Sequence, residues 1–223
     1  VLHPEAVYLH QGRAWRGVGV HELSRTARVE PDDGDTYTQA RSRTDIAVRS
    51  TTAVRPVGRA QLRLGEVEVT SQVTGYRVLS VTGHHVLSHH ELDLPPSELR
   101  TTAMWWTFDE ELVADAGLDD VALPGALHAA EHAAIGILPL FTICDRWDVG
   151  GVSTAWTPDT GQATVFIHDG YPGGAGIAEL AFGAADRHLS ATLDVVASCP
   201  CDDGCPGCVQ SPKCGNGNEP LDK

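Results

Sequence analysis

The sequence contains few lysines, one methionine and no long hydrophobic run. No stretch of about 18 apolar residues occurs, so we expect neither a membrane-spanning helix nor a membrane partner. A basic segment followed by an apolar one, the mark of a secretory signal, is also missing, which favours a reducing, cytoplasmic setting. The chain begins with valine rather than methionine, and this suggests a piece of a longer protein.

Basic residues are scarce in the second half of the chain. Residues 1–100 hold 12 arginines and 12 acidic residues, whereas residues 101–223 hold four basic and 18 acidic residues. An acidic surface repels phosphate at long range, so we expect nucleic-acid contacts in the arginine-rich half. The acidic half is typical of a solvated surface that keeps a protein soluble. An interaction module that docks a basic protein partner is an alternative.

The hydrophobic pattern predicts an α+β protein. In residues 1–100, β-branched residues alternate at period two between turn signals, which predicts a small barrel or twisted antiparallel sheet. Residues 101–223 are mixed, with a helix predicted between Pro124 and Pro139 and paired strands in "DVGGVSTAW" and "GQATVFIHD". One or two further helices lead to a cysteine-rich end. We therefore predict a β-rich part at 1–100 and a mixed helical and strand domain at 101–223.

Five of the six cysteines lie in "CPCDDGCPGCVQSPKC" near the carboxyl end. Closely spaced thiolates are typical of a tetrahedral Zn²⁺ site, and a reducing compartment disfavours disulfides. Cys205 and Cys208 form a CxxC knuckle whose turn we expect Gly207 to permit. A redox dithiol and disulfides are the alternatives. Four thiolates would make a closed, structural zinc site. Spacing leaves the second pair open among Cys199, Cys201 and Cys214.

A second group of potential metal ligands precedes the cysteines. The segment "HAAEH" places His128 and His132 four residues apart on a predicted helix, with Glu131 between them. This is the H-x-x-E-H order of inverted zinc metalloproteases, in which the glutamate acts as general base. A third ligand is needed, and the nearest downstream glutamate is Glu179. A zinc hydrolase is therefore an alternative, although histidines that bind polar partners at a packing interface explain so short a pattern more simply.

A glycine-rich turn follows a predicted strand in "VFIHDGYPGGAGIAE". Backbone N–H groups of such turns bind anions where a helix begins. The spacing is not that of a Walker motif, and no lysine follows it. Tight packing between strand and helix is the simpler interpretation.

Several segments together resemble one known family, the superfamily 2 DNA helicases of the mitomycin repair factor A type. The resemblance is to their carboxyl-terminal region and is carried, in order, by "VYLHQG", "DLPP" followed by "TTAMWW", "HAAEHA", "CDRWDVGG", "HDGYPGGAGIAE" and "CPCDDGCPGCVQSPKCGNGNEPLDK". It extends over most of the chain, and the arginine-rich composition suits mycobacterial members. It implies a parent that is a DNA-dependent ATPase and 3′-to-5′ translocase acting in DNA repair. Two RecA-like motor domains would lie upstream and use ATP and Mg²⁺.

The resemblance also implies roles for individual residues. Four cysteines match the family's zinc motif, with Cys214 as an extra: Cys199, Cys201, Cys205 and Cys208. For the matching segment around Glu131 no proteolysis is implied. The chain contains no Walker A lysine, DEAH-like acidic pair or arginine finger, so we do not expect it to hydrolyse ATP alone.

In a helicase of this kind, the accessory domain is expected to hold single-stranded DNA in the channel of the motor. Phosphate contacts would come from arginines of the β-rich part. The candidates are Arg13, Arg16, Arg41, Arg43, Arg49 and Arg55.

Overall fold

The computed structural model describes residues 3–21 and 23–223. Strands dominate the first half of the chain, and helices enter after residue 109. The predicted α+β class is therefore confirmed. Among the described residues, no helix is both long and apolar enough to cross a membrane.

The chain forms two compact units. Unit 1 comprises Val1–Arg43 and Gln72–Pro96, and unit 2 comprises Thr44–Ser71 and Ser97–Lys223. The sequence predicted one boundary near residue 100, whereas the units alternate along the chain. They do so because two long strands contribute to both units, namely β4 (Thr36–Val57) and β5 (Ala60–Ser80).

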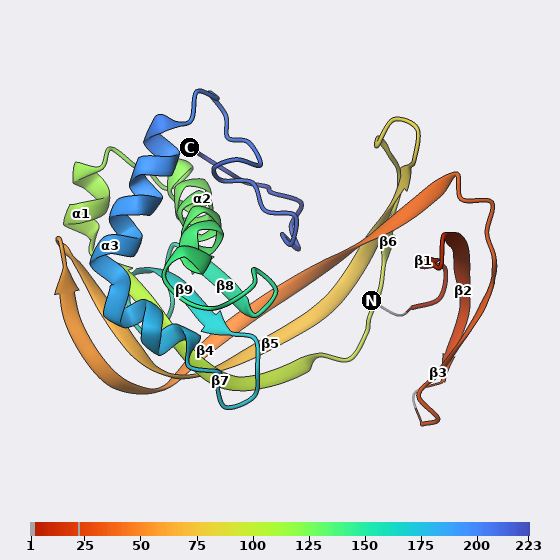
Figure 1. Cartoon of the computed structure of the whole chain (residues 1–223), viewed down its shortest axis with the longest axis horizontal. Helices are drawn as coiled ribbons and strands as arrows, with labels where there is room; N and C mark the ends of the chain where they lie inside the picture. Colours follow the sequence, from red (N-terminus) through yellow and green to blue (C-terminus); the bar gives the residue numbers. More distant parts are fainter. Residues whose placement is uncertain (1–2, 22) are drawn as a thin grey trace. The chain divides into compact units, whose positions relative to one another are not determined.

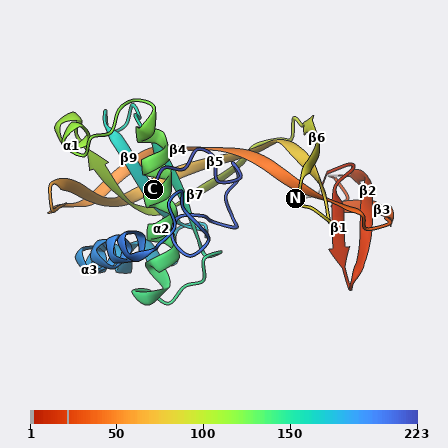
Figure 2. The ribbon, with the colours of Figure 1, turned by 90° about the horizontal axis from the view of Figure 1, so that it is seen from above.

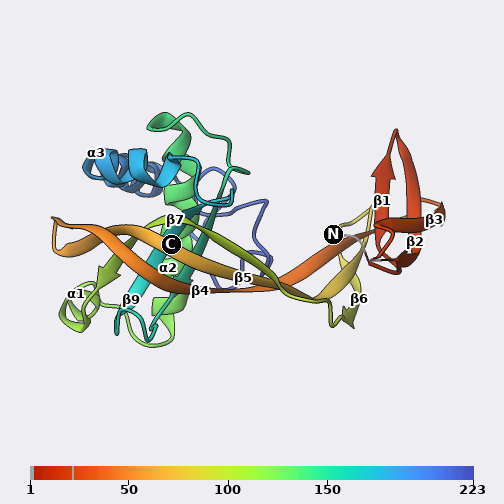
Figure 3. The same ribbon diagram turned by 90° about the horizontal axis from the view of Figure 1, so that it is seen from below.

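Unit 1 consists of antiparallel strands. β1 (Val7–His10), β2 (Arg13–His21) and β3 (Thr26–Pro31) form a small sheet in that order, which Figures 2 and 3 show from two sides. β6 (Val86–Glu91) pairs with the last residues of β5. The predicted twisted antiparallel arrangement is thus present in this part of the chain.

Unit 2 is built on a sheet in the order β4-β5-β7-β9-β8. β7 (Ser97–Phe108) pairs antiparallel with β5 and with β9 (Ala163–Asp169), and β8 (Val149–Thr154) pairs antiparallel with β9. The two strands predicted as a pair are β8 and β9. The Val48 N–H donates to Asp159 Oδ2 over 2.7 Å, so β4 also reaches the loop that joins them.

Three helices belong to unit 2, and α2 and α3 cover one side of its sheet (Figure 1). The short α1 (Glu110–Asp115) begins at Asp109, whose carboxylate accepts from the Leu112 N–H. α2 (Ala122–Ile137) passes into a 3₁₀ turn, η1 (Leu138–Leu140), because Pro139 has no N–H to continue the α-helix. α3 (Ile177–Ser198) is a single helix that leads directly to the cysteines.

The core occupies both faces of the unit 2 sheet, since side chains alternate along a strand. Met104 and Trp106 of β7 pack with residues of α2 and α3. Their neighbour Trp105 faces the other way and packs against Phe166, with ring centroids 5.7 Å apart. Trp105 is only 1% exposed, so the aromatic segment of β7 is core and offers no stacking surface.

Candidate metal centre

The four predicted cysteines lie together where α3 ends. Their Sγ atoms are 3.5 Å apart for Cys199–Cys201 and Cys201–Cys208, 3.6 Å for Cys199–Cys205, and 3.8 Å for Cys205–Cys208. Sulfurs placed about 2.3 Å from a tetrahedral zinc ion are about 3.8 Å from one another. A disulfide would instead require about 2.05 Å. The cluster therefore has the dimensions of a four-thiolate zinc site.

A tight turn brings the CxxC pair together. The N–H groups of Cys208 and Gln210 donate to the Cys205 carbonyl over 3.0 and 3.1 Å. Gly204 has φ 90°, where only glycine is unstrained, and a Cβ there would overlap Val209. Gly207 is not among the residues with positive φ, so our expectation that it permits the turn was wrong.

Residues 199–209, here called the cysteine segment, pack on the alanine-rich face of α2. Buried Ala129 and Ala133 lie four residues apart and contact Cys208 and Val209. Small side chains at this spacing let the segment approach the helix closely. Cys208 and Val209 are the only residues beyond α3 that form part of the buried apolar core. A bound ion would therefore supply much of what holds this segment in place.

Lys223 fastens the other side of the cluster. Its Nζ donates to the carbonyls of Cys199 and Cys201 over 2.7 and 2.6 Å. These bonds fix the backbone of two of the four candidate ligands. Lys223 is thus a positioning residue that the spacing of the cysteines did not reveal.

The pKa values of two of the four thiols are shifted in opposite directions. The Cys201 N–H and then the neighbouring thiols lower the pKa of the Cys199 thiol to about 7. Burial, followed by hydrogen bonds with Cys208 and Cys199, raises the pKa of the Cys201 thiol to about 12. Four thiolates this close repel one another, and a divalent ion would remove that repulsion.

Cys214 lies outside the four-cysteine cluster and belongs to a second group. Its Sγ is 3.4 Å from His128 Nε2, and His132 also contacts it. Candidate ligand atoms of these three residues all lie within 4.8 Å of one another. Glu179 is not a member and instead lines a pocket beside Glu98 and Arg100. The third partner of the two histidines is therefore Cys214.

Glu131 is buried beside this second group. A side chain at Gly151 of β8 would overlap the Glu131 carboxylate, so that glycine makes room for it. Burial raises the pKa of Glu131, partly offset by a hydrogen bond with Ser153. Glu131 is not among the residues whose ligand atoms converge.

A side chain of the protein itself, Asp169, occupies the glycine-rich turn before α3. The Asp169 carboxylate accepts from the N–H groups of Ala175, Ile177 and Ala178 over 2.5, 3.2 and 2.8 Å. Asp169 is fully buried. It therefore occupies the position where an external anion would bind, and the turn is a strand-to-helix junction.

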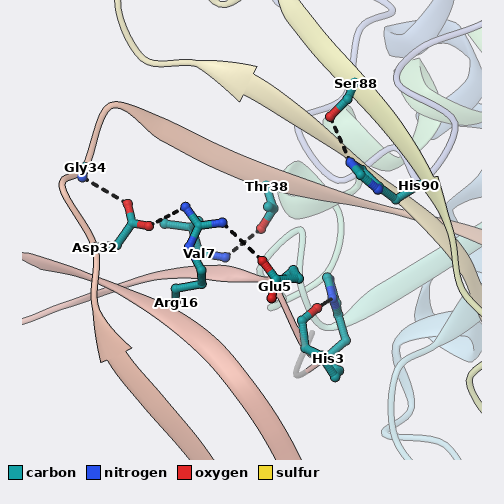
Figure 4. Close-up of polar contacts among 10 residues, drawn as sticks. His3, Glu5, Val7, Arg16, Asp32, Gly34, Thr38, Ser88 and His90 are labelled. Atoms are coloured by element: carbon teal, nitrogen blue, oxygen red, sulfur yellow. Dashed lines mark hydrogen bonds and ion pairs between the residues drawn. The ribbon is translucent and has the colours of Figure 1, made fainter.

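The six arginines predicted to bind phosphate are divided between the units and differ in their partners. In unit 1, Arg16 pairs with Asp32 over 2.6 Å and with Glu5 over 3.3 Å (Figure 4). The Asp32 contact raises the pKa of Arg16. Also in unit 1, Arg13, Arg41 and Arg43 are exposed.

The two candidates in unit 2 are also held by carboxylates. Arg49 pairs with Glu68, and Arg55 pairs with Asp186 over 2.9 Å. Arg55 donates in addition to the Phe182 carbonyl over 2.9 Å. These partners come from distant parts of the chain, which is why the arginine pattern did not predict them.

Comparison with known proteins identifies relatives of the chain. Residues 130–209 match the family described as the MrfA Zn-binding domain (MZB). The chain is 31% identical over 209 residues to the uncharacterized ATP-dependent helicase YprA of Bacillus subtilis, covering 94% of this chain and 28% of that protein. It is 42% identical over 100 residues to the uncharacterized protein MJ1572.1 of Methanocaldococcus jannaschii, covering 44% of this chain and 89% of that one.

A solved structure is similar along nearly the whole chain. The crystal structure of the DUF1998 helicase MrfA bound to DNA matches with a TM-score of 0.67 and 30% identity, covering 95% of this chain and 28% of that one. The chain thus spans less than a third of the length of either matched helicase. The region matched by the MZB family contains the four clustered cysteines and ends before Cys214.

Proposed function

We propose that this chain, which belongs to the MrfA Zn-binding domain family, is the zinc-stabilised, non-motor carboxyl-terminal part of an ATP-dependent DNA helicase. The observation that carries the proposal is the cluster of four sulfurs 3.5–3.8 Å apart within the matched region. The ion would be structural, because four protein ligands leave no open position on it. The ligands would be Cys199, Cys201, Cys205 and Cys208.

The parent protein would supply the motor. Its upstream RecA-like domains would bind ATP and Mg²⁺ and move 3′ to 5′ along DNA in a repair process. The similarity to helicases named as ATP-dependent supports this assignment. We expect DNA-stimulated ATPase activity in the full-length protein and none in this chain. ATP hydrolysis by the isolated chain would contradict the proposal that only the upstream motor domains hydrolyse ATP.

This part would help to hold single-stranded DNA by its phosphates. The exposed Arg13 and Arg41 of unit 1 suit this role best, because Arg16, Arg49 and Arg55 would have to leave carboxylate partners. Arg13 and Arg41 are therefore the leading candidates, and the exposed Arg43 stays a candidate beside the three paired arginines. The acidic half of the chain would bind no DNA, since its charge repels phosphate.

The role is tested by titrating the chain with a fluorescein-labelled single-stranded oligonucleotide at several salt concentrations. In a plot of the logarithm of the DNA-binding constant against the logarithm of the salt concentration, each lost phosphate contact should make the slope less steep by about 0.7 to 1. We expect this change for Arg13→Ala and for Arg41→Ala. Arg187→Ala, which removes an exposed arginine from the acidic half, is the matched control. If the chain does not bind the oligonucleotide, or if Arg187→Ala changes the slope as much as Arg13→Ala and Arg41→Ala do, the DNA-holding role is contradicted.

A further inference from the structure

His128 and His132 present their rings to the same thiol. Four residues apart on α2, they lie on one face of the helix, and their ring centroids are 4.2 Å apart. The sulfur of Cys214 is 3.4 Å from His128 Nε2. In a tetrahedral zinc site with Zn–S of about 2.3 Å and Zn–N of about 2.05 Å, nitrogen and sulfur are about 3.6 Å apart. The three side chains therefore have the spacing of ligands to one ion.

Backbone carbonyls orient both imidazoles. His128 Nδ1 lies 2.7 Å from the Pro220 carbonyl oxygen, and His132 Nδ1 lies 2.8 Å from that of Val209. A carbonyl only accepts, so each Nδ1 must carry its proton, and in the neutral ring Nε2 then has a free lone pair. Metal-binding histidines are held in this way, with the second nitrogen donating to a carbonyl or carboxylate.

Cys214 is held in place just as firmly. The Asn218 N–H donates to its sulfur over 3.2 Å, and the Asn218 carboxamide bonds the backbone of Ser211. The adjacent Lys213 donates to the carbonyls of Arg146 and Val149 over 2.9 and 2.6 Å. The sulfur is thus fixed by contacts on both sides of the residue.

A metal-free arrangement leaves this geometry unexplained. A thiolate could pair with one protonated imidazole, but the other neutral ring would then direct its lone pair at a negatively charged sulfur. If both rings were protonated, two positive charges would lie about 4 Å apart within a partly buried site. A cation between the three side chains satisfies all three donors at once.

We propose that His128, His132 and Cys214 form a second transition-metal site, which takes Zn²⁺ or a similar divalent ion independently of the four-cysteine cluster. Imidazole and thiolate ligands suit zinc. Three protein ligands leave one position for water or another donor, as in catalytic rather than structural zinc sites. This proposal goes beyond the helicase assignment and does not depend on it.

The test is a Co²⁺ titration of the metal-stripped chain under anaerobic, reducing conditions. We expect the wild-type chain to bind two equivalents. Cys214→Ser should bind one and keep the strong sulfur-to-cobalt absorption of the four-cysteine site, whereas Cys205→Ser should lose that absorption and keep the weaker one. Cys144→Ser removes a thiol that lies in neither group and should still bind two equivalents. These variants therefore test the two metal sites independently of each other.

A second variant covers the case in which Cys214→Ser disturbs the carboxyl-terminal segment. His128→Ala leaves every cysteine in place, and it too should bind one equivalent with an unchanged circular dichroism spectrum. In the wild-type chain, the second equivalent should also slow alkylation of Cys214 by iodoacetamide. A wild-type chain that binds one equivalent, a Cys214→Ser or His128→Ala chain that still binds two, or unprotected Cys214 would overturn the proposal.

Discussion

Replacement of Ala133 by leucine should loosen the cysteine segment. Ala133 is 1% exposed and contacts the segment around Cys208, so the added carbons have no free space. Overpacking of a tight core costs about 1–3 kcal/mol. For a chain of this size each kcal/mol lowers Tm by about 2–4 °C, which predicts a decrease of about 2 to 12 °C. Because the segment is displaced from α2, zinc should also be lost faster to a chelator.

Ala130→Leu is the matched control. Ala130 is the exposed neighbour on the same helix, and leucine is nearly as good a helix former as alanine, so this change should cost less than about 0.5 kcal/mol. Thermal unfolding of both zinc-loaded variants, followed by circular dichroism, gives Tm, and a chromogenic chelator gives the rate of zinc loss. Equal Tm values and equal rates for the two variants would refute the packing of the cysteine segment on α2.

Three further changes probe other parts of the structure. Lys223→Met removes both bonds to the Cys199 and Cys201 carbonyls and should weaken zinc binding about 10- to 100-fold in a chelator competition; unchanged affinity would contradict its positioning role. Burial lowers the pKa of His188, so its neutral ring makes its full contribution to the free energy of unfolding above the unfolded-state pKa of about 6.5. Below that pH the free energy of unfolding should fall by up to about 1.4 kcal/mol per pH unit. Urea unfolding should show a flatter dependence between pH 6.5 and 5 for His188→Leu, and an unchanged slope would argue against a neutral buried ring. Trp105→Ala should cost about 3–5 kcal/mol in the same assay, and a cost below 1 kcal/mol would place Trp105 outside the core.

Local sequence signals predicted the elements around the cysteines. Pro139 ends α2 as expected, and the paired strands are β8 and β9. The CxxC spacing of Cys205 and Cys208 predicted a shared site because only two residues separate the sulfurs. These features depend on neighbouring residues, and neighbouring residues are what a sequence pattern records.

Features that depend on distant residues were not predicted. Cys214 meets His128 across 86 positions of the chain, so spacing could only offer it as a spare member of the cysteine cluster. Arg55 finds its carboxylate at Asp186, 131 residues away. The two long strands, β4 and β5, contribute to both units, which a single boundary near residue 100 could not describe. The glycines of the turn before α3 left anion binding open as an alternative, whereas in the structure the Asp169 carboxylate occupies that turn.

Above all, we propose that the four clustered cysteines hold a structural zinc ion. The most direct measurement is zinc X-ray absorption spectroscopy on the Cys214→Ser chain, which removes a ligand of the second site and leaves the cluster intact. We predict one zinc per chain with four sulfur neighbours at about 2.3 Å and no nitrogen shell. A folded chain without zinc, or zinc bound in part by nitrogen, would contradict the claim.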